Sequence, residues 1–136
     1  MRRITHIVIH CTATAQTATV ASISKYWREV LKWKAPGYHY LIAADGHITQ
    51  LLDERLPSNG VAGHNSHIIN VCYIGGVDAN GKPVDNRTMA QKAALIGTIK
   101  EIKTRHPMAV VQGHRDFQGV KKDCPCFDAK SEYARL

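Results

Sequence analysis

The sequence predicts an α/β fold: a single domain, residues 1–136, with a central mixed β-sheet flanked by helices. Short apolar runs rich in β-branched residues alternate with two segments of helical period, in the order strand, helix, hairpin, strand, helix, strand. With 136 residues, 44% of them hydrophobic, the chain can bury about two-thirds of its unfolded surface in one core. No repeat, linker or low-complexity tract divides it.

The first strand and helix are predicted within the first third of the chain. Residues 4–10 (ITHIVIH) form a β-branched run that passes into a polar stretch, so His10 is expected at a strand end. Thr19 can cap the helix that follows, and the APG of residues 35–37 ends it. The apolar residues at helical spacing are Val20, Ile23, Trp27, Val30 and Leu31.

A hairpin and a central strand come next. The runs GYHYLIA and HITQLL flank an Asp-Gly turn at residues 45–46, which predicts a β-hairpin with Tyr38 at the start of its first strand. Residues 58–67 (SNGVAGHNSH) form a loop that carries His64 and His67. The continuous apolar run IINVCYIGGV that follows is typical of a central strand.

The last third predicts a long helix and a short strand. Thr88 caps the helix, which runs to about His106 and is ended by Pro107. Its apolar positions are Met89, Ala93, Leu95, Ile96 and Ile99. The run MAVVQGH predicts a strand that delivers His114 at its end, and a short helix can start at Asp128 after an irregular loop.

Composition narrows the functional classes. No run of about 18 apolar residues exists, and the N-terminal apolar stretch is too short for a signal peptide, so we expect no membrane span and a cytoplasmic location at synthesis. The four cysteines are then expected as reduced thiols. The net charge of +7 indicates an anionic partner, but its even spread along the chain argues against nucleic acid.

Two histidines suggest a metal site in a surface groove at the strand ends. His10 and His114 are both predicted where strands of one sheet end, a common place for ligand sites. A catalytic zinc ion typically takes three protein ligands and keeps one position for water, and Cys124 or Cys126 could complete such a set. Because HExxH and paired CxxC motifs are absent, spacing alone does not choose the ligands.

Four motifs together resemble a known family. IHCTAT, GYHYLI, NVCYIGG and GHRD followed by KKDCPCFD are similar, in order and separation, to type 2 N-acetylmuramoyl-L-alanine amidases. This superfamily includes peptidoglycan recognition proteins and the amidase-type lysozymes, or endolysins, of phages. The resemblance spans about residues 4–130.

The resemblance implies a role for six residues. The zinc ligands it implies are His10, His114 and Cys124, with water at the fourth position. It also implies two catalytic residues, Tyr38 and Lys122. In this family, a histidine from the loop that corresponds to the one carrying His64 often lies near the substrate. A loop histidine without a partner is an equally weighted interpretation of His64. Cys126 stands where relatives usually have Gly or Ser.

The chemistry of amide hydrolysis is consistent with these roles. A bound zinc ion lowers the pKa of its water from about 15.7 toward 7, which supplies a nucleophile at neutral pH. Lys122 can stabilise the oxyanion of the tetrahedral intermediate, and the Tyr38 hydroxyl can hydrogen-bond the water or the intermediate. The proton donor to the leaving amine stays open between Tyr38, Lys122 and the water. Asp116 or a backbone carbonyl can orient His114.

The other cysteines and histidines are expected to be structural. Cys11 follows His10 directly and so points to the opposite face of the strand, as a buried small residue. Cys72, inside the apolar run, is expected as a core thiol. His6 shares the face of His10 but lies roughly 13 Å away along the strand. Trp33, near the end of the first helix, can border the groove.

We therefore expect a monomeric peptidoglycan amidase with one zinc ion. It would hydrolyse the amide between N-acetylmuramic acid and the L-alanine of the stem peptide, as a phage or prophage endolysin that reaches the cell wall after release from the cytoplasm. One alternative is a peptidoglycan-binding module of the same fold without activity. Another is a basic nucleic-acid-binding domain whose zinc is structural, held by four protein ligands.

Overall fold

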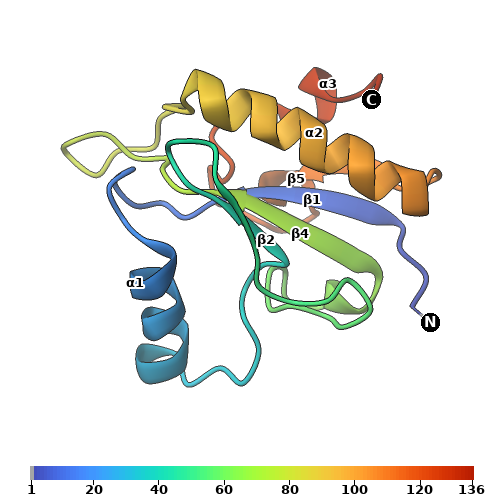
Figure 1. Cartoon of the computed structure of the whole chain (residues 1–136), viewed down its shortest axis with the longest axis horizontal. Helices are drawn as coiled ribbons and strands as arrows, with labels where there is room; N and C mark the ends of the chain where they lie inside the picture. The colour runs from blue at the N-terminus through green and yellow to red at the C-terminus, as the bar shows by residue number, and fades with distance from the viewer. Residues whose placement is uncertain (1) are drawn as a thin grey trace.

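The computed structural model describes residues 2–136 and contains a five-stranded mixed sheet in the order β3-β2-β4-β1-β5 (Figure 1). β1 pairs in parallel with β4 on one side and with β5 on the other, and β2 pairs in parallel with β4. β3 runs antiparallel to β2, as the Asp-Gly turn predicted, but β2 begins at Tyr40, so Tyr38 lies before the strand and not at its start. The strands are β1 (His6–Cys11), β2 (Tyr40–Ile42), β3 (Ile48–Gln50), β4 (Ile68–Tyr73) and β5 (Val110–Gly113).

The predicted helices are present, with one difference in type. The first begins at its Thr19 cap as α1 (Val20–Lys25) and continues as a π-helical turn (Tyr26–Val30). The others are α2 (Met89–Arg105) and α3 (Ala129–Glu132), with short 3-10 turns at Asn65–His67 and His114–Asp116. Within residues 2–136, no helix combines the length and the apolar character needed to span a bilayer.

The capping residues of α2 also fasten the helix to the sheet. Thr88 Oγ1 accepts a hydrogen bond from the Gln91 backbone N–H, and the Gln91 side chain accepts one from Thr88. The buried amide of Gln91 also donates to the carbonyls of Ile42 and Ile74. The start of α2 is therefore held against the ends of β2 and β4, which fixes the helix across one face of the sheet.

The buried side of α2 differs in part from the apolar positions used to predict the helix. Leu95 and Ile99 are fully buried, whereas Met89, Ala93 and Ile96 are exposed. Polar Gln91 and Thr98 occupy buried positions instead. A hydrophobic pattern with polar residues inside it predicted the helix correctly but did not predict its orientation on the sheet.

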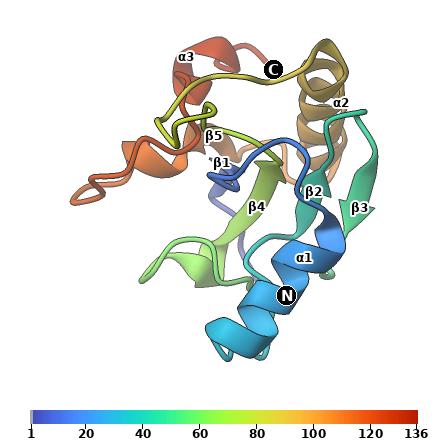
Figure 2. The same ribbon diagram turned by 90° about the vertical axis from the view of Figure 1, so that its left-hand side faces the viewer.

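The two faces of the sheet carry different structures. On one face, α2 packs through Leu95, Ile99 and Ile102 against a core that includes Ile7 and Ile9 of β1. The opposite face is covered by α1 and by loops, with small cores centred on the other side chains of the strands. Figures 1 and 2 show α1 and α2 on different sides of the sheet. Strand alternation therefore points His10 away from α2.

A buried arginine holds the C-terminal segment to the rest of the fold. The Arg87 guanidinium lies 3.3 Å from the centroid of the Phe127 ring and forms ion pairs with Asp85 at 2.9 Å and Glu132 at 2.8 Å. It also donates to the Tyr133 hydroxyl at 3.1 Å. The segment before α2 is thus connected to α3.

Replacing Arg87 with Met should destabilise the protein in a pH-dependent way. Hydrogen bonds from Arg87 lower the pKa of both Asp85 and Glu132. Their contribution to stability is therefore present above the unfolded carboxyl pKa values of about 4 and is lost as pH falls through the lower folded values. We expect Arg87→Met to cost about 1–3 kcal/mol of unfolding free energy at about pH 7, and less at about pH 3.

Urea unfolding at both pH values measures this difference. Arg55→Met is the matched control, because its ion pair with Asp53 is exposed and should contribute little to stability at either pH. An equal loss of stability for Arg87→Met at both pH values would contradict the expectation.

Candidate active site

Three predicted ligand residues from distant parts of the chain converge at one point. The potential ligand atoms of His10, His114 and Cys124 all lie within 4.8 Å of one another. β1 and β5 are paired so that Ile9 stands opposite Gly113, and the residue that follows each of these in the chain is a histidine. The two imidazole ring centroids are consequently 4.8 Å apart. These three residues are called the ligand cluster below.

The orientation of His10 is set by Asn70. His10 Nε2 lies 2.7 Å from Asn70 Oδ1, and Asn70 Nδ2 donates to Ser58 Oγ at 2.7 Å. Gly60 approaches so closely that a Cβ there would lie 2.3 Å from Asn70 Cγ. With Nε2 engaged, His10 presents Nδ1 to Cys124, whose Sγ is 3.8 Å away. Asn70 was not among the predicted site residues, although an amide within the apolar run IINVCYIGG was a signal.

The loop that carries Cys124 is anchored by the backbone. The N–H of Cys11 donates to Cys124 Sγ at 3.2 Å, and the N–H of Arg115 donates to the Cys124 carbonyl at 2.9 Å. Asp116 was one of two candidate partners for His114, the other being a backbone carbonyl, and within residues 2–136 the structure shows no hydrogen bond between the Asp116 and His114 side chains. The Asp116 carboxylate accepts from the Gly113 N–H at 2.8 Å and thereby stabilises the turn that follows β5.

The protonation states of the ligand cluster suit metal binding. Burial lowers the pKa of His10 to about 4, and burial together with the nearby His10 lowers the pKa of His114 to about 4. Hydrogen bonding from Cys11 lowers the pKa of Cys124 and outweighs the opposing effect of burial. Both imidazoles are therefore neutral near pH 7, and the sulfur is biased toward thiolate, as a metal ligand requires.

A groove of about 670 Å³ opens over the ligand cluster and brings the other three predicted site residues to its walls, namely Tyr38, His64 and Lys122. The Tyr38 ring lies 4.9 Å from the His10 ring, centroid to centroid. The His64 ring packs 4.6 Å from Phe117. Trp33 borders the groove, as expected, and Trp27 does so as well. An adjoining hollow along α1 extends the groove and shares Tyr38 with it.

The remaining cysteines and histidines have structural surroundings. Cys11 and Cys72 are buried, in agreement with the expectation for each. The His6 ring lies 5.9 Å from the Phe117 ring and hydrogen-bonds Thr5. His39 is fully buried, with Nδ1 accepting from the Asn70 N–H at 3.0 Å. None of these four residues belongs to the ligand cluster.

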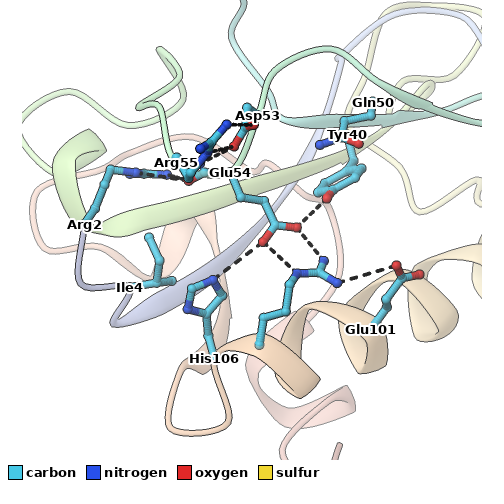
Figure 3. A pocket seen from close by; sticks show the side chains of 10 residues that line it. Arg2, Ile4, Tyr40, Gln50, Asp53, Glu54, Arg55, Glu101 and His106 are labelled. Carbon is cyan, nitrogen blue, oxygen red and sulfur yellow. Dashed lines mark hydrogen bonds and ion pairs between the residues drawn. The ribbon is translucent and has the colours of Figure 1, made fainter.

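A second cavity, of about 570 Å³, lies beside the C-terminal end of α2 and is shown in Figure 3. At its centre Glu54 accepts hydrogen bonds from Tyr40 and Arg105 and pairs with His106. Burial opposes the ionisation of Glu54, but the hydrogen bonds from Arg105 and Tyr40 outweigh it, so its pKa is lowered. These charges neutralise one another, and no predicted site residue lines this cavity.

Comparison with known proteins shows to which protein family the chain belongs. The family model described as N-acetylmuramoyl-L-alanine amidase matches residues 1–127. The chain belongs to this amidase family. It is 37% identical over 125 residues to the endolysin of Klebsiella phage KP32, covering 91% of this chain and 82% of that protein. It is 33% identical over 126 residues to the endolysin of Escherichia phage T7, with the same coverage of 91% and 82%.

Solved structures share the fold of this amidase at low identity. The Ph2119 endolysin from a Thermus scotoductus bacteriophage has a TM-score of 0.79 at 23% identity, covering 92% of this chain and 79% of the other. The N-acetylmuramoyl-L-alanine amidase LysC from Clostridium intestinale has a TM-score of 0.80 at 20% identity, with coverage of 97% and 83%. Drosophila PGRP-LB has a TM-score of 0.81 at 16% identity, with coverage of 100% and 82%. The predicted superfamily and fold are therefore confirmed.

Removing the amide that orients His10 should weaken metal binding. For Asn70→Ala we expect the affinity for Zn²⁺ to fall about 10–100-fold, because the His10 ring loses the partner that fixes Nδ1 toward Cys124. Competition with a chromophoric chelator near pH 7 measures this affinity. Ser58→Ala keeps the bond between Asn70 and His10 and should lose less. Unchanged affinity in a folded Asn70→Ala protein would show that Asn70 does not orient a ligand.

Proposed function

We propose that the chain is a zinc-dependent peptidoglycan amidase that hydrolyses the amide between the lactyl group of N-acetylmuramic acid and the L-alanine of the stem peptide. The observation that carries the proposal is the ligand cluster at the base of an open groove, in a chain of the amidase family. The endolysin relatives support a further proposal, that the enzyme degrades the host cell wall during phage release.

The ligand cluster fits a catalytic zinc ion by its donor chemistry. Two neutral imidazoles and one thiolate match the nitrogen and sulfur ligands that zinc prefers, and three protein ligands leave a fourth position toward the groove. One thiolate leaves the site with a net charge of about +1, which favours attack on a carbonyl. When bound, zinc supplies Lewis acidity and activates water at neutral pH.

Lys122 and Tyr38 supply hydrogen bonds to the reacting amide. Lys122 lines the groove two residues before Cys124, where its ammonium can donate to the carbonyl oxygen as negative charge develops there. Burial raises the pKa of Tyr38, so its hydroxyl keeps its proton and can act as a donor, and the Tyr38 ring lies 4.9 Å from the His10 ring. Both groups stabilise the same developing charge, and either can pass a proton to the leaving amine.

The walls of the groove suit an extended polymer. His64 and Lys122 lie on walls formed by the loops after β3 and after β5, while Trp27 and Trp33 line the side near α1. We assign His64 to substrate contact, because it faces the groove and is not part of the ligand cluster. The net charge of +7 favours association with an anionic cell envelope.

A peptidoglycan-binding module without activity is the second candidate function. The structural neighbours include PGRP-LB and two Drosophila proteins titled as peptidoglycan recognition proteins, so the fold is not restricted to proteins titled as amidases. The complete ligand cluster favours hydrolysis over binding alone. A structural zinc in a nucleic-acid-binding domain fits less well, since such sites are closed by four protein ligands.

Hydrolysis of purified peptidoglycan tests the proposed activity. We expect release of new L-alanine amino termini that stops with a chelator and returns with Zn²⁺. Cys124→Ala should lose metal binding and activity, whereas the matched variant Cys126→Ala should keep at least about a tenth of the activity, because Cys126 does not belong to the ligand cluster. Binding of peptidoglycan without release of amino termini would favour the binding module, and equal losses in both variants would refute the choice of Cys124.

Lys122→Ala should separate catalysis from metal binding. We expect kcat to fall roughly a hundredfold, as for the loss of one donor to an oxyanion, while the zinc content stays at one ion per chain. Lys121→Ala, which also lines the groove, is the matched control and should retain most of the activity. Loss of zinc from Lys122→Ala would show that its role is structural.

A further inference from the structure

A pair of thiols lies directly behind the ligand cluster. Cys11 Sγ and Cys126 Sγ are 3.8 Å apart, and both are free thiols. Cys11 is the neighbour of the ligand His10 in β1, and Cys126 follows the ligand Cys124 by two residues. The two thiols therefore belong to the two segments that supply two of the three residues of the ligand cluster, and they face each other where these segments meet.

The surrounding backbone leaves room for this pair. Gly76 is so close that a Cβ there would lie 2.6 Å from Cys11 Sγ and 3.7 Å from Cys126 Sγ. Cys126 also donates its S–H to the Gly76 carbonyl at 3.3 Å. Cys11 is buried, whereas Cys126 is partly exposed. Cys126 is thus the more exposed residue of the pair.

The backbone of Cys126 gives a second, independent observation. Its φ is +70°, in the left-handed region where glycine is unstrained and residues with a Cβ are disfavoured. A glycine would meet the backbone requirement at this position without strain. The chain instead has a thiol there, directed at a second thiol.

We propose that Cys11 and Cys126 are a site of oxidative modification, and that they form a disulfide by exchange with a small disulfide such as oxidised glutathione. The bond would join the loop of Cys124 to β1 and leave Cys124 free to bind the metal. A bond of about 2.05 Å requires the two sulfurs to approach from their present separation of 3.8 Å. The part that concerns metal retention rests on the proposed zinc site, whereas the linkage does not.

The exchange proceeds in two balanced steps. The Cys126 thiolate attacks oxidised glutathione, which forms a mixed disulfide and releases one glutathione thiolate. The Cys11 thiolate then attacks the Cys126 sulfur of that mixed disulfide and releases the second glutathione. Two protein thiols are oxidised to one disulfide while one glutathione disulfide is reduced to two thiols.

Such a bond would act on the metal site through the chain. The Cys11 N–H already donates to Cys124 Sγ, so fixing Cys11 to Cys126 holds that donor and the ligand loop together. The oxidised protein should therefore release zinc more slowly than the reduced protein. A protein that moves from a reducing cytoplasm to an oxidising cell exterior would gain this bond where it meets its substrate.

Mass spectrometry of the full-length, zinc-loaded protein tests the linkage. After prolonged incubation with oxidised glutathione at about pH 8.5, we expect a loss of about 2 Da, and tandem spectra in which Cys11 is joined to Cys126 while Cys124 is alkylated only after unfolding. Cys126→Ser should abolish the linkage, and Cys72→Ala should keep it. A bond that involves Cys124, or no bond in the folded protein, would overturn the proposal.

Zinc release to excess chelator provides the second measurement. The oxidised protein should lose zinc about tenfold more slowly than the reduced protein, and Cys126→Ser should show no difference between the two conditions. Equal release rates in the presence of the mapped bond would overturn the role in metal retention. Failure of peptidoglycan hydrolysis would count against the proposed function and would leave the mapped linkage unaffected, so the two failures are distinguishable.

Discussion

The parallel pairing of β1 with strands on both of its sides is the constraint on which the site depends. Because β1 and β5 run in the same direction and in a fixed register, they end at the same edge of the sheet. His10 and His114, which follow the paired residues Ile9 and Gly113, meet there. Side chains alternate along a strand, so a slip of one residue would turn His10 toward α2. The core under α2, with Ile7 and Ile9 fully buried, makes that slip unfavourable.

Hydrogen bonds then fix the orientation of the residues that the strand register brings together. His10 is oriented by the buried amide of Asn70, which is itself held by Ser58. The loop that brings Cys124 is held from both sides, by Arg115 at the Cys124 carbonyl and by the Tyr73 hydroxyl, which donates to the Pro125 carbonyl at 2.6 Å. The site is thus pre-organised by hydrogen bonds from β1, β4 and the turn after β5.

Sequence patterns predicted the strands, helices and their order, because strand and helix periods and turn residues are local signals. His10 and His114 could be placed at strand ends for the same reason. The choice of Cys124 over Cys126 came from family resemblance, since the approach of an irregular loop to a strand leaves no local pattern. Asn70 was missed because the partner of a buried amide is set by strand pairing, and the orientation of α2 was missed because Gln91 and Thr98 are polar yet buried.

The two faces of the sheet have different roles, and this difference determines which substitutions the fold can accept during evolution. The face under α2 carries most of the large buried side chains, while the groove on the opposite face is walled by loops and by α1. Substitutions in those loops leave the main core intact. The fold can therefore acquire new preferences among cell-wall polymers by changing loops, at little cost in stability, while the sheet keeps the ligand residues in place.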